Sequence, residues 1–208
     1  MSDERKVRCF LALSCPGEWQ RVFGELLHSL KEKLPLSCFK WVRAEKIHLT
    51  LRFFGGITAS ELAQIGHIAN SIGRHFPSFD LDAAQLGCFP TIRKPRVLWL
   101  GLKESTSVLP DLHRAIAIQT ASIGQPPENR PFKAHLTLAR IKEVDRSGPQ
   151  AIEQALRIPV PSFPRWHVKE FHILQSNLSP TGASYTDLQI TPLALSTSAT
   201  LEASPTCD

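Results

Sequence analysis

Two short segments of the chain have the same sequence, His48-Leu49-Thr50-Leu51 and His135-Leu136-Thr137-Leu138. The unperturbed pKa of histidine, about 6.5, allows it to give or take a proton near neutral pH. In an extended strand alternate side chains share a face, so each histidine lies beside its threonine and the leucines face the other way. Each copy therefore presents one imidazole and one hydroxyl from an apolar backing. Two copies facing each other would form a site for acid–base chemistry.

The segments around the two copies alternate between strand and helix patterns. From apolar alternation, helical spacing and turn residues we expect strands at 7–13, 39–42, 47–54, 79–89, 96–102, 133–141, 166–177 and 185–195, and helices at 18–33, 106–123 and 149–158. A further helix is expected after Thr58, which precedes Glu61 by three residues as in a capping box. Gly55-Gly56 is expected to end the first motif strand, and 90–95 to form a basic loop bounded by prolines.

Strands and helices interleave in two rounds, and each round contains one motif strand. This order predicts an α+β fold with two pseudo-symmetric lobes, mostly antiparallel sheets flanked by helices, and a central cleft lined by one motif on each wall. We expect residues 1–195 to form a single bilobal domain. The remaining residues, 196–208, are small and polar and are expected to be a disordered tail.

The composition is that of an ordinary soluble protein that could meet a polyanion. Hydrophobic residues make up 42% of the 208 residues, and the formal net charge is +5. The charged N-terminus lacks an apolar run long enough for a signal peptide or a membrane span. The five cysteines are odd in number and form no Cys-x-x-Cys pair, which argues against a disulfide framework or a zinc knuckle. We expect a cytoplasmic monomer that does not contact membranes.

The chain resembles a known family in four segments. These are FKWVRAEKIHLTLRFFG at 39–55, RVLWLG at 96–101, RPFKAHLTLAR at 130–140, and the pattern Ser-x-Leu-x-Pro-x-Gly-x-x-Tyr at 176–185. They are similar to the RNA 2′,3′-cyclic phosphodiesterases, also called 2′-5′ RNA ligases, of the two-histidine phosphoesterase superfamily. The likeness runs from about residue 7 to residue 195. It implies a bilobal fold with both motifs in the cleft.

The resemblance also implies an activity and roles for the motif residues. Family members hydrolyse RNA that ends in a 2′,3′-cyclic phosphate to a 2′-phosphate, and some join RNA ends through a 2′-5′ linkage. On this basis His135 is expected to be the base that activates water, and His48 the acid that protonates the leaving 3′ oxygen. Thr50 and Thr137 are expected to donate hydrogen bonds to the phosphate oxygens as negative charge grows there.

Four further residues are expected to bind the substrate. Arg140 matches the arginine that follows the second motif in the family, although a regular strand would turn it away from His135 unless a bulge intervened or Arg140 lay beyond the end of the strand. Arg130 is a candidate for backbone phosphates. Phe54 shares the predicted cleft face with the first motif and is expected to stack on a base. Arg43 lies on a predicted loop that could rim the cleft.

The expected scheme requires no cofactor and no metal. The expected partners are RNA ends that carry a 2′,3′-cyclic phosphate, with tRNA fragments among the candidates. Two alternatives stay open: the same chemistry on a small nucleotide, such as a nucleoside 2′,3′-cyclic phosphate or ADP-ribose 1″,2″-cyclic phosphate, and a non-catalytic RNA-binding module. The remaining six histidines are interpreted as structural.

Overall fold

The structure is a computed structural model of residues 1–208 that describes residues 6–34, 38–127, 131–142, 148–179 and 182–195. The predicted tail, 196–208, lies outside the described residues, and so does Arg130.

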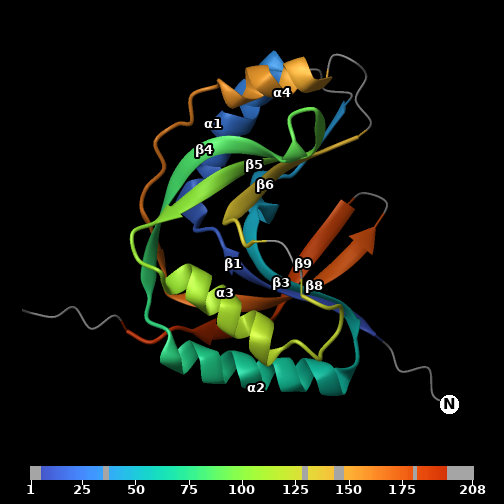
Figure 1. Ribbon diagram of the computed structural model, residues 1–208, viewed down its shortest axis with the longest axis vertical. Helices are drawn as coiled ribbons and strands as arrows, with labels where there is room; N and C mark the ends of the chain where they lie inside the picture. Colours follow the sequence, from blue (N-terminus) through green and yellow to red (C-terminus); the bar gives the residue numbers. More distant parts are fainter. Residues whose placement is uncertain (1–5, 35–37, 128–130, 143–147, 180–181, 196–208) are drawn as a thin grey trace, which may run out of the picture.

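Two antiparallel sheets form the framework of the protein (Figure 1). The four-stranded sheet has the order β3-β1-β8-β9, and the five-stranded sheet has the order β2-β6-β5-β4-β7. The strands are β1 (Val7–Ser14), β2 (Phe39–Trp41), β3 (His48–Ile57), β4 (Phe79–Thr91), β5 (Lys94–Glu104), β6 (His135–Ile141), β7 (Trp166–Val168), β8 (Glu170–Ser179) and β9 (Gly182–Pro192). The two motifs begin β3 and β6, so each sheet carries one of them.

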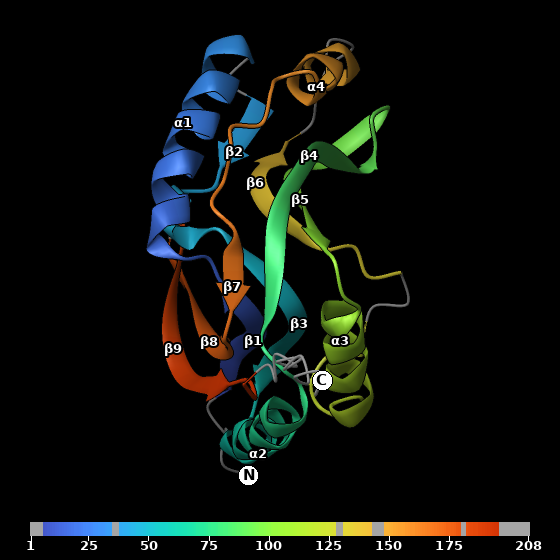
Figure 2. The same ribbon diagram turned by 90° about the vertical axis from the view of Figure 1, so that its left-hand side faces the viewer.

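In the described part of the chain, four α-helices cover the sheets in two pairs. They are α1 (Gly17–Lys33), α2 (Ala59–His75), α3 (Val108–Gln119) and α4 (Gly148–Leu156). Helices α2 and α3 lie with the four-stranded sheet, whereas α1 and α4 lie with the five-stranded sheet (Figures 1 and 2). The predicted α+β fold with two lobes is therefore confirmed. None of the described helices has the length and apolar character needed to cross a bilayer.

Helix α2 shows why the local sequence folds as predicted. The Thr58 side chain accepts a hydrogen bond from the backbone of Glu61, and the Glu61 carboxylate accepts one from the backbone of Thr58. This capping box satisfies two donors that the first helical turn leaves unpaired. Ile65, Ala69 and Ile72 then recur at helical spacing and are buried in the core.

The two lobes are not the two halves of the sequence. The first half contributes β1, β3 and α2 to the lobe of the four-stranded sheet, but its α1 and β4 belong to the other lobe. The second half is divided in the same way: β5, β6 and α4 belong to the lobe of the five-stranded sheet, whereas α3 and β8 belong to the lobe of the four-stranded sheet. This exchange gives the pseudo-symmetry that the repeated motif predicts and interlocks the lobes.

The strand expected at 166–177 is two strands in different sheets. Strand β7 pairs with β4, and β8 pairs with β1. Lys169 separates them, and its carbonyl accepts a hydrogen bond from the backbone of Leu193 at 2.7 Å. The prediction of one continuous strand was wrong because the apolar pattern does not reveal that the chain passes from one sheet to the other at this point.

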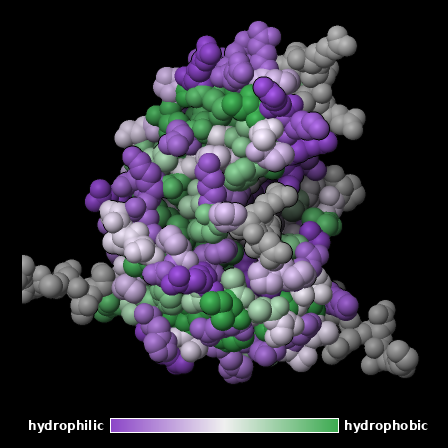
Figure 3. All heavy atoms as spheres, in the orientation of Figure 1, coloured by the Kyte–Doolittle hydropathy of each residue, from purple (hydrophilic) through white to green (hydrophobic). Residues whose placement is uncertain are grey.

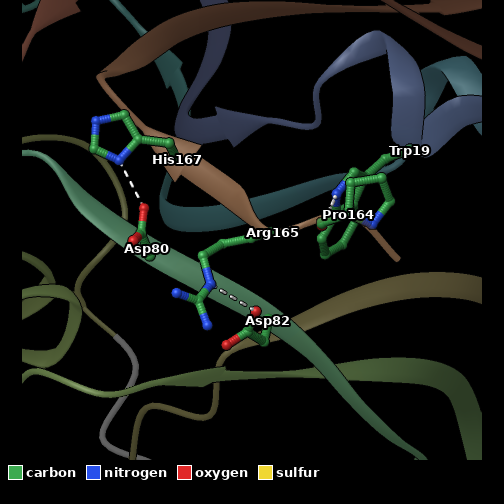
Figure 4. Close-up of polar contacts among 6 residues, drawn as sticks. All are labelled: Trp19, Asp80, Asp82, Pro164, Arg165 and His167. Atoms are coloured by element: carbon green, nitrogen blue, oxygen red, sulfur yellow. Dashed lines mark hydrogen bonds and ion pairs between the residues drawn. The ribbon is translucent and has the colours of Figure 1, made fainter. Parts of the chain in front are cut away.

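Side chains hold the start of this crossing in place (Figure 4). His167 Nδ1 donates a hydrogen bond to the Asp80 carboxylate at 2.7 Å. The Arg165 guanidinium lies 3.4 Å from the carboxylate of Asp82. Trp19 of α1 donates its indole N–H to the carbonyl of Pro164 at 2.8 Å.

Two turn predictions also differ from the structure. Strand β3 does not end at Gly55-Gly56 but runs to Ile57, with Gly55 at a φ of 77° that favours glycine. The loop expected at 90–95 is reduced to a two-residue turn, since β4 reaches Thr91 and β5 starts at Lys94. Pro90 and Pro95 pair with each other at the end of this hairpin, where the strands tolerate a missing donor.

The buried Arg52 of β3 yields a prediction about stability. Its guanidinium donates hydrogen bonds to the carbonyls of Thr120, Ile123 and Gln125 at 3.0–3.3 Å, and the residue is 5% exposed. Arg52→Met removes the guanidinium donor from all three carbonyls, although that of Thr120 still accepts from the backbone N–H of Ile123 at 3.0 Å. We therefore expect a loss of about 2–4 kcal/mol in the free energy of unfolding, measured with urea.

The control for this prediction is Arg114→Met. Arg114 forms an exposed ion pair with Asp111, and removal of such a pair costs about 1 kcal/mol or less. Equal losses for the two variants would contradict the structural role given to Arg52.

A candidate active site between the two lobes

Strand β3 contains one extra residue directly after its motif threonine. Thr50 pairs with Ala12 of β1, but Arg52 pairs with the adjacent Leu11, so Leu51 has no partner opposite it. Such a bulge shifts the alternation of side chains by one residue. Leu51 and Arg52 are accordingly both buried behind the sheet.

Strand β6 contains the same bulge at the same place. Thr137 pairs with Trp99 of β5, and Ala139 pairs with the adjacent Leu98, which leaves Leu138 without a partner on β5. The burial sequence over the first five residues of β6 matches that of β3: half-buried, buried, half-buried, buried, buried. The repeat in the sequence is therefore also a repeat in backbone geometry.

The bulges decide which side chain joins each histidine on the cleft face. The fifth residue after a histidine would face away in a regular strand, but the extra residue turns it back. In β6 this residue is Arg140, whose charge acts on both His48 and Tyr185. The bulge anticipated as a condition for Arg140 to reach the site is therefore present.

In β3 the same shift makes the prediction for Phe54 wrong. Phe54 is fully buried in the hydrophobic core, where its ring cannot stack on a base. Its neighbour Phe53 takes the position that corresponds to Arg140, and packs against the small cluster that contains Phe10. The cause of the error is the assumption of strict alternation along β3.

Both motif imidazoles are held in the same way by the backbone. His48 Nδ1 donates a hydrogen bond to the carbonyl of Lys46 at 2.8 Å, and His135 Nδ1 donates one to the carbonyl of Lys133 at 2.7 Å. A carbonyl oxygen only accepts, so Nδ1 carries the proton in each ring. The Nε2 atom of each histidine is then the one that can exchange a proton with a ligand.

The two imidazoles and Arg140 share one electrostatic environment. The pKa of His48 is lowered from 6.5, first by burial and then by the positive charges of Arg140 and His135, while the hydrogen bond to Lys46 opposes the change. Residues from opposite lobes therefore act on one another. On the face shown in Figure 3, the surface is hollowed between the lobes.

Aromatic rings flank each histidine. The His48 ring lies 4.9 Å from the ring of Phe10 and 5.1 Å from that of Tyr185, measured between centroids. His135 lies 4.9 Å from Phe89 and 6.3 Å from Trp99. These rings restrict both imidazoles to defined orientations and exclude water from their sides.

Two residues near the site were not singled out from the sequence. Tyr185, the only tyrosine in the chain, reaches His48 from β9, and burial raises the pKa of its hydroxyl while the charge of Arg140 opposes the rise. Lys133 places its ammonium 4.4 Å from the ring centre of Trp99. A signal for Tyr185 existed, since it ends the sequence pattern at 176–185, but that pattern assigns it no role.

The remaining predicted residues are placed as follows. Thr50 and Thr137 are half-buried and lie on the same strand faces as the motif histidines. Arg43 is exposed at the start of the 3-10 turn η2 (Ala44–Lys46), where it forms an ion pair with Glu45 at 3.0 Å.

Comparison with known proteins places the chain in a family. The family model described as LigT like Phosphoesterase matches residues 13–99 and 100–185. The first match contains the motif of β3, and the second contains that of β6. The two matches together span most of the chain, so the protein belongs to this phosphoesterase family.

Individual relatives agree with this membership. The chain is 30% identical over 165 residues to a protein of Aquifex aeolicus named RNA 2′,3′-cyclic phosphodiesterase, covering 78% of this chain and 87% of that protein. It is also 30% identical over 184 residues to the Escherichia coli protein of the same name, covering 88% and 94%. The crystal structure of E. coli LigT complexed with 3′-AMP superimposes with a TM-score of 0.72 at 28% identity, covering 90% of this chain and 98% of that one.

The electrostatic coupling in the site predicts a titration experiment. In an NMR titration of the free protein we expect His48 to protonate below pH 6.5, because burial and two nearby positive charges disfavour its cationic form. In Arg140→Gln one of these charges is gone, so the midpoint should move upward.

Arg114→Gln, which removes an exposed arginine of α3, should leave the His48 midpoint unchanged. A His48 midpoint above 6.5 would contradict the lowered pKa. A midpoint that does not change in Arg140→Gln would show that the two side chains are not coupled.

Proposed function

We propose that the protein is an RNA 2′,3′-cyclic phosphodiesterase that opens the terminal cyclic phosphate to a 2′-phosphomonoester. The observation that carries this proposal is the matched pair of histidines, each bonded through Nδ1 to the carbonyl two residues earlier and each presenting Nε2. The names of the relatives give the substrate class.

Ring opening at phosphorus is an in-line displacement that needs a proton-handling group on each side. His135 Nε2 takes a proton from the attacking water, and His48 Nε2–H gives one to the departing 3′ oxygen. The hydroxyls of Thr50 and Thr137 donate to the non-bridging oxygens, where negative charge grows in the transition state. The guanidinium of Arg140 adds a fixed positive charge next to the same oxygens.

The lowered pKa of His48 bears on its role as the acid. In the free protein the neutral form of His48 is favoured, because its ring is buried beside positive charges. An anionic phosphate bound between the histidines offsets those charges and raises the pKa of His48. Substrate binding therefore promotes the protonation that the acid needs, and the free enzyme favours substrate capture at mildly acidic pH.

The same groups can serve 2′-5′ ligation, in which a 5′-hydroxyl takes the place of water. His135 takes the proton of this hydroxyl as it attacks phosphorus, and His48 protonates the departing 3′ oxygen, so that the phosphate joins the 2′ and 5′ oxygens. The strained cyclic phosphate would supply the free energy for this step. Hydrolysis is the outcome favoured in water because water is in large excess over the hydroxyl.

A small nucleotide is the second candidate substrate. The related E. coli LigT has been solved as a complex with 3′-AMP, a mononucleotide. The chemistry at phosphorus would be the same. A comparison of kcat/KM for a nucleoside 2′,3′-cyclic phosphate and for an RNA oligonucleotide ending in one separates the two candidates.

Removal of either motif histidine tests the acid–base roles. We expect His48→Ala and His135→Ala to lower kcat by about 10²–10⁴ each, because each removes a proton-transfer group. The rate is measured on an oligonucleotide ending in a 2′,3′-cyclic phosphate. His28→Ala is the matched control, since His28 is exposed on α1 and pairs only weakly with Glu32. A single variant that keeps more than about a tenth of the activity would contradict the scheme.

The position of the product phosphate tests which oxygen leaves. We expect a 2′-phosphate end, resolved by chromatography, and the same rate in the presence of EDTA because the scheme uses only protein groups. A 3′-phosphate would mean that the 2′ oxygen leaves. A rate abolished by EDTA would mean that a metal ion takes part.

A further inference from the structure

The cleft face of the four-stranded sheet continues beyond the motif of β3. The bulge brings Phe53 onto this face, where it pairs with Phe10 of β1. Arg8 lies two residues before Phe10 and so shares its face. The Arg8 guanidinium lies over the Phe53 ring, with its central carbon 4.6 Å from the ring centre. This stack orders a cation next to the site.

A groove opens beside this stack, between the start of β1 and the end of β8. Its volume is about 690 Å³. It is lined by Lys6, Val7, Arg8, Gln175, Ser176, Asn177 and Leu178. Two cationic side chains and a set of hydroxyl and amide groups therefore border one open space. These are groups that bind phosphate and sugar oxygens.

The donors of Arg8 are available to a ligand. Arg8 is exposed, and within the described ranges no carboxylate forms an ion pair with it. A guanidinium stacked on an aromatic ring keeps its planar fork of N–H groups for bidentate binding of a phosphate. The Phe53 ring also limits the conformations of the long side chain, so less entropy is lost on binding.

The distance from the motif histidine indicates which part of a substrate reaches the stack. His48 pairs with Ser14 and Phe53 pairs with Phe10, so four residues of β1 separate their backbone positions, or about 13 Å at 3.3 Å per residue. The side chains narrow this gap, because the Phe10 ring lies 4.9 Å from the His48 ring and Phe53 packs against the cluster that contains Phe10. A phosphate bound to Arg8 would therefore be a neighbour of the reacting cyclic phosphate rather than that phosphate itself. An RNA with a cyclic phosphate at its 3′ end continues only in the 5′ direction.

We propose that Arg8, stacked on Phe53, binds the phosphodiester that joins the terminal nucleotide to its 5′ neighbour. This inference rests on the proposed function and adds a substrate class to it: RNA chains of two or more nucleotides are preferred over mononucleotides. Lys6, Ser176 and Asn177 extend the same binding surface along the groove.

The experiment compares two substrates with Arg8→Gln. The substrates are a nucleoside 2′,3′-cyclic phosphate and a short RNA ending in one. We expect kcat/KM for the short RNA to fall about tenfold, because one charge-assisted phosphate contact is lost. The value for the mononucleotide should change less than twofold. The dependence of log kcat/KM for the short RNA on log salt concentration should become shallower by about 0.7.

Two further variants serve as controls for charge and for side-chain geometry. Arg74→Gln removes an equal charge from the exposed end of α2 and should leave both substrates unaffected. Arg8→Lys keeps the charge without the planar fork, and should restore the salt dependence but only part of the activity on the short RNA.

Equal losses on both substrates, or no loss on the short RNA, would overturn the proposal. Failure of the proposed function would look different, since the unaltered protein would then turn over neither substrate. In that case the affinity for an RNA dinucleotide carrying a 2′-phosphate still tests Arg8. Weaker binding by Arg8→Gln would support the contact between Arg8 and the phosphodiester, and unchanged binding would overturn it.

Discussion

One extra residue directly after each motif threonine is the constraint on which the candidate active site depends. Antiparallel pairing forces side chains to alternate, and only a bulge can bring the fifth residue after a histidine back to the histidine's face. Because the bulges follow Thr50 and Thr137 alike, both lobes present the same arrangement of imidazole, hydroxyl and a third group. That third group differs, since Arg140 supplies charge on one wall and Phe53 supplies an aromatic face on the other.

A backbone carbonyl, rather than a carboxylate, accepts the hydrogen bond from Nδ1 of both motif histidines. A carboxylate bonded to Nδ1 would stabilise the imidazolium and raise its pKa, as in triads. A neutral carbonyl fixes the ring with a smaller effect on charge, and the remaining environment of His48 lowers its pKa. Such a site responds to the charge of what binds in it, which suits a reaction on an anionic phosphate diester.

Exchange of elements between the halves of the chain holds these walls opposite each other. A lobe made from one half alone would be joined to its partner by a single linker and would be free to move as a domain. Here each half places one helix and two strands in the other lobe, and the crossing before β8 is fixed by Asp80, Asp82 and Trp19. The two motif histidines, one from each lobe, can then keep a constant separation.

The amino-acid sequence by itself determined the duplicated His-Leu-Thr-Leu motif, the α+β character, the capping box at Thr58 and the family resemblance, because these depend on local pattern and spacing. It could not reveal that 166–177 divides between two sheets, or that Phe53 rather than Phe54 faces the cleft. A bulge and a change of sheet arise from pairing with strands distant in the chain. Only the tertiary structure brings Arg140 and Tyr185 close to His48 and places Arg8 over Phe53, since each of these contacts depends on such long-range pairing.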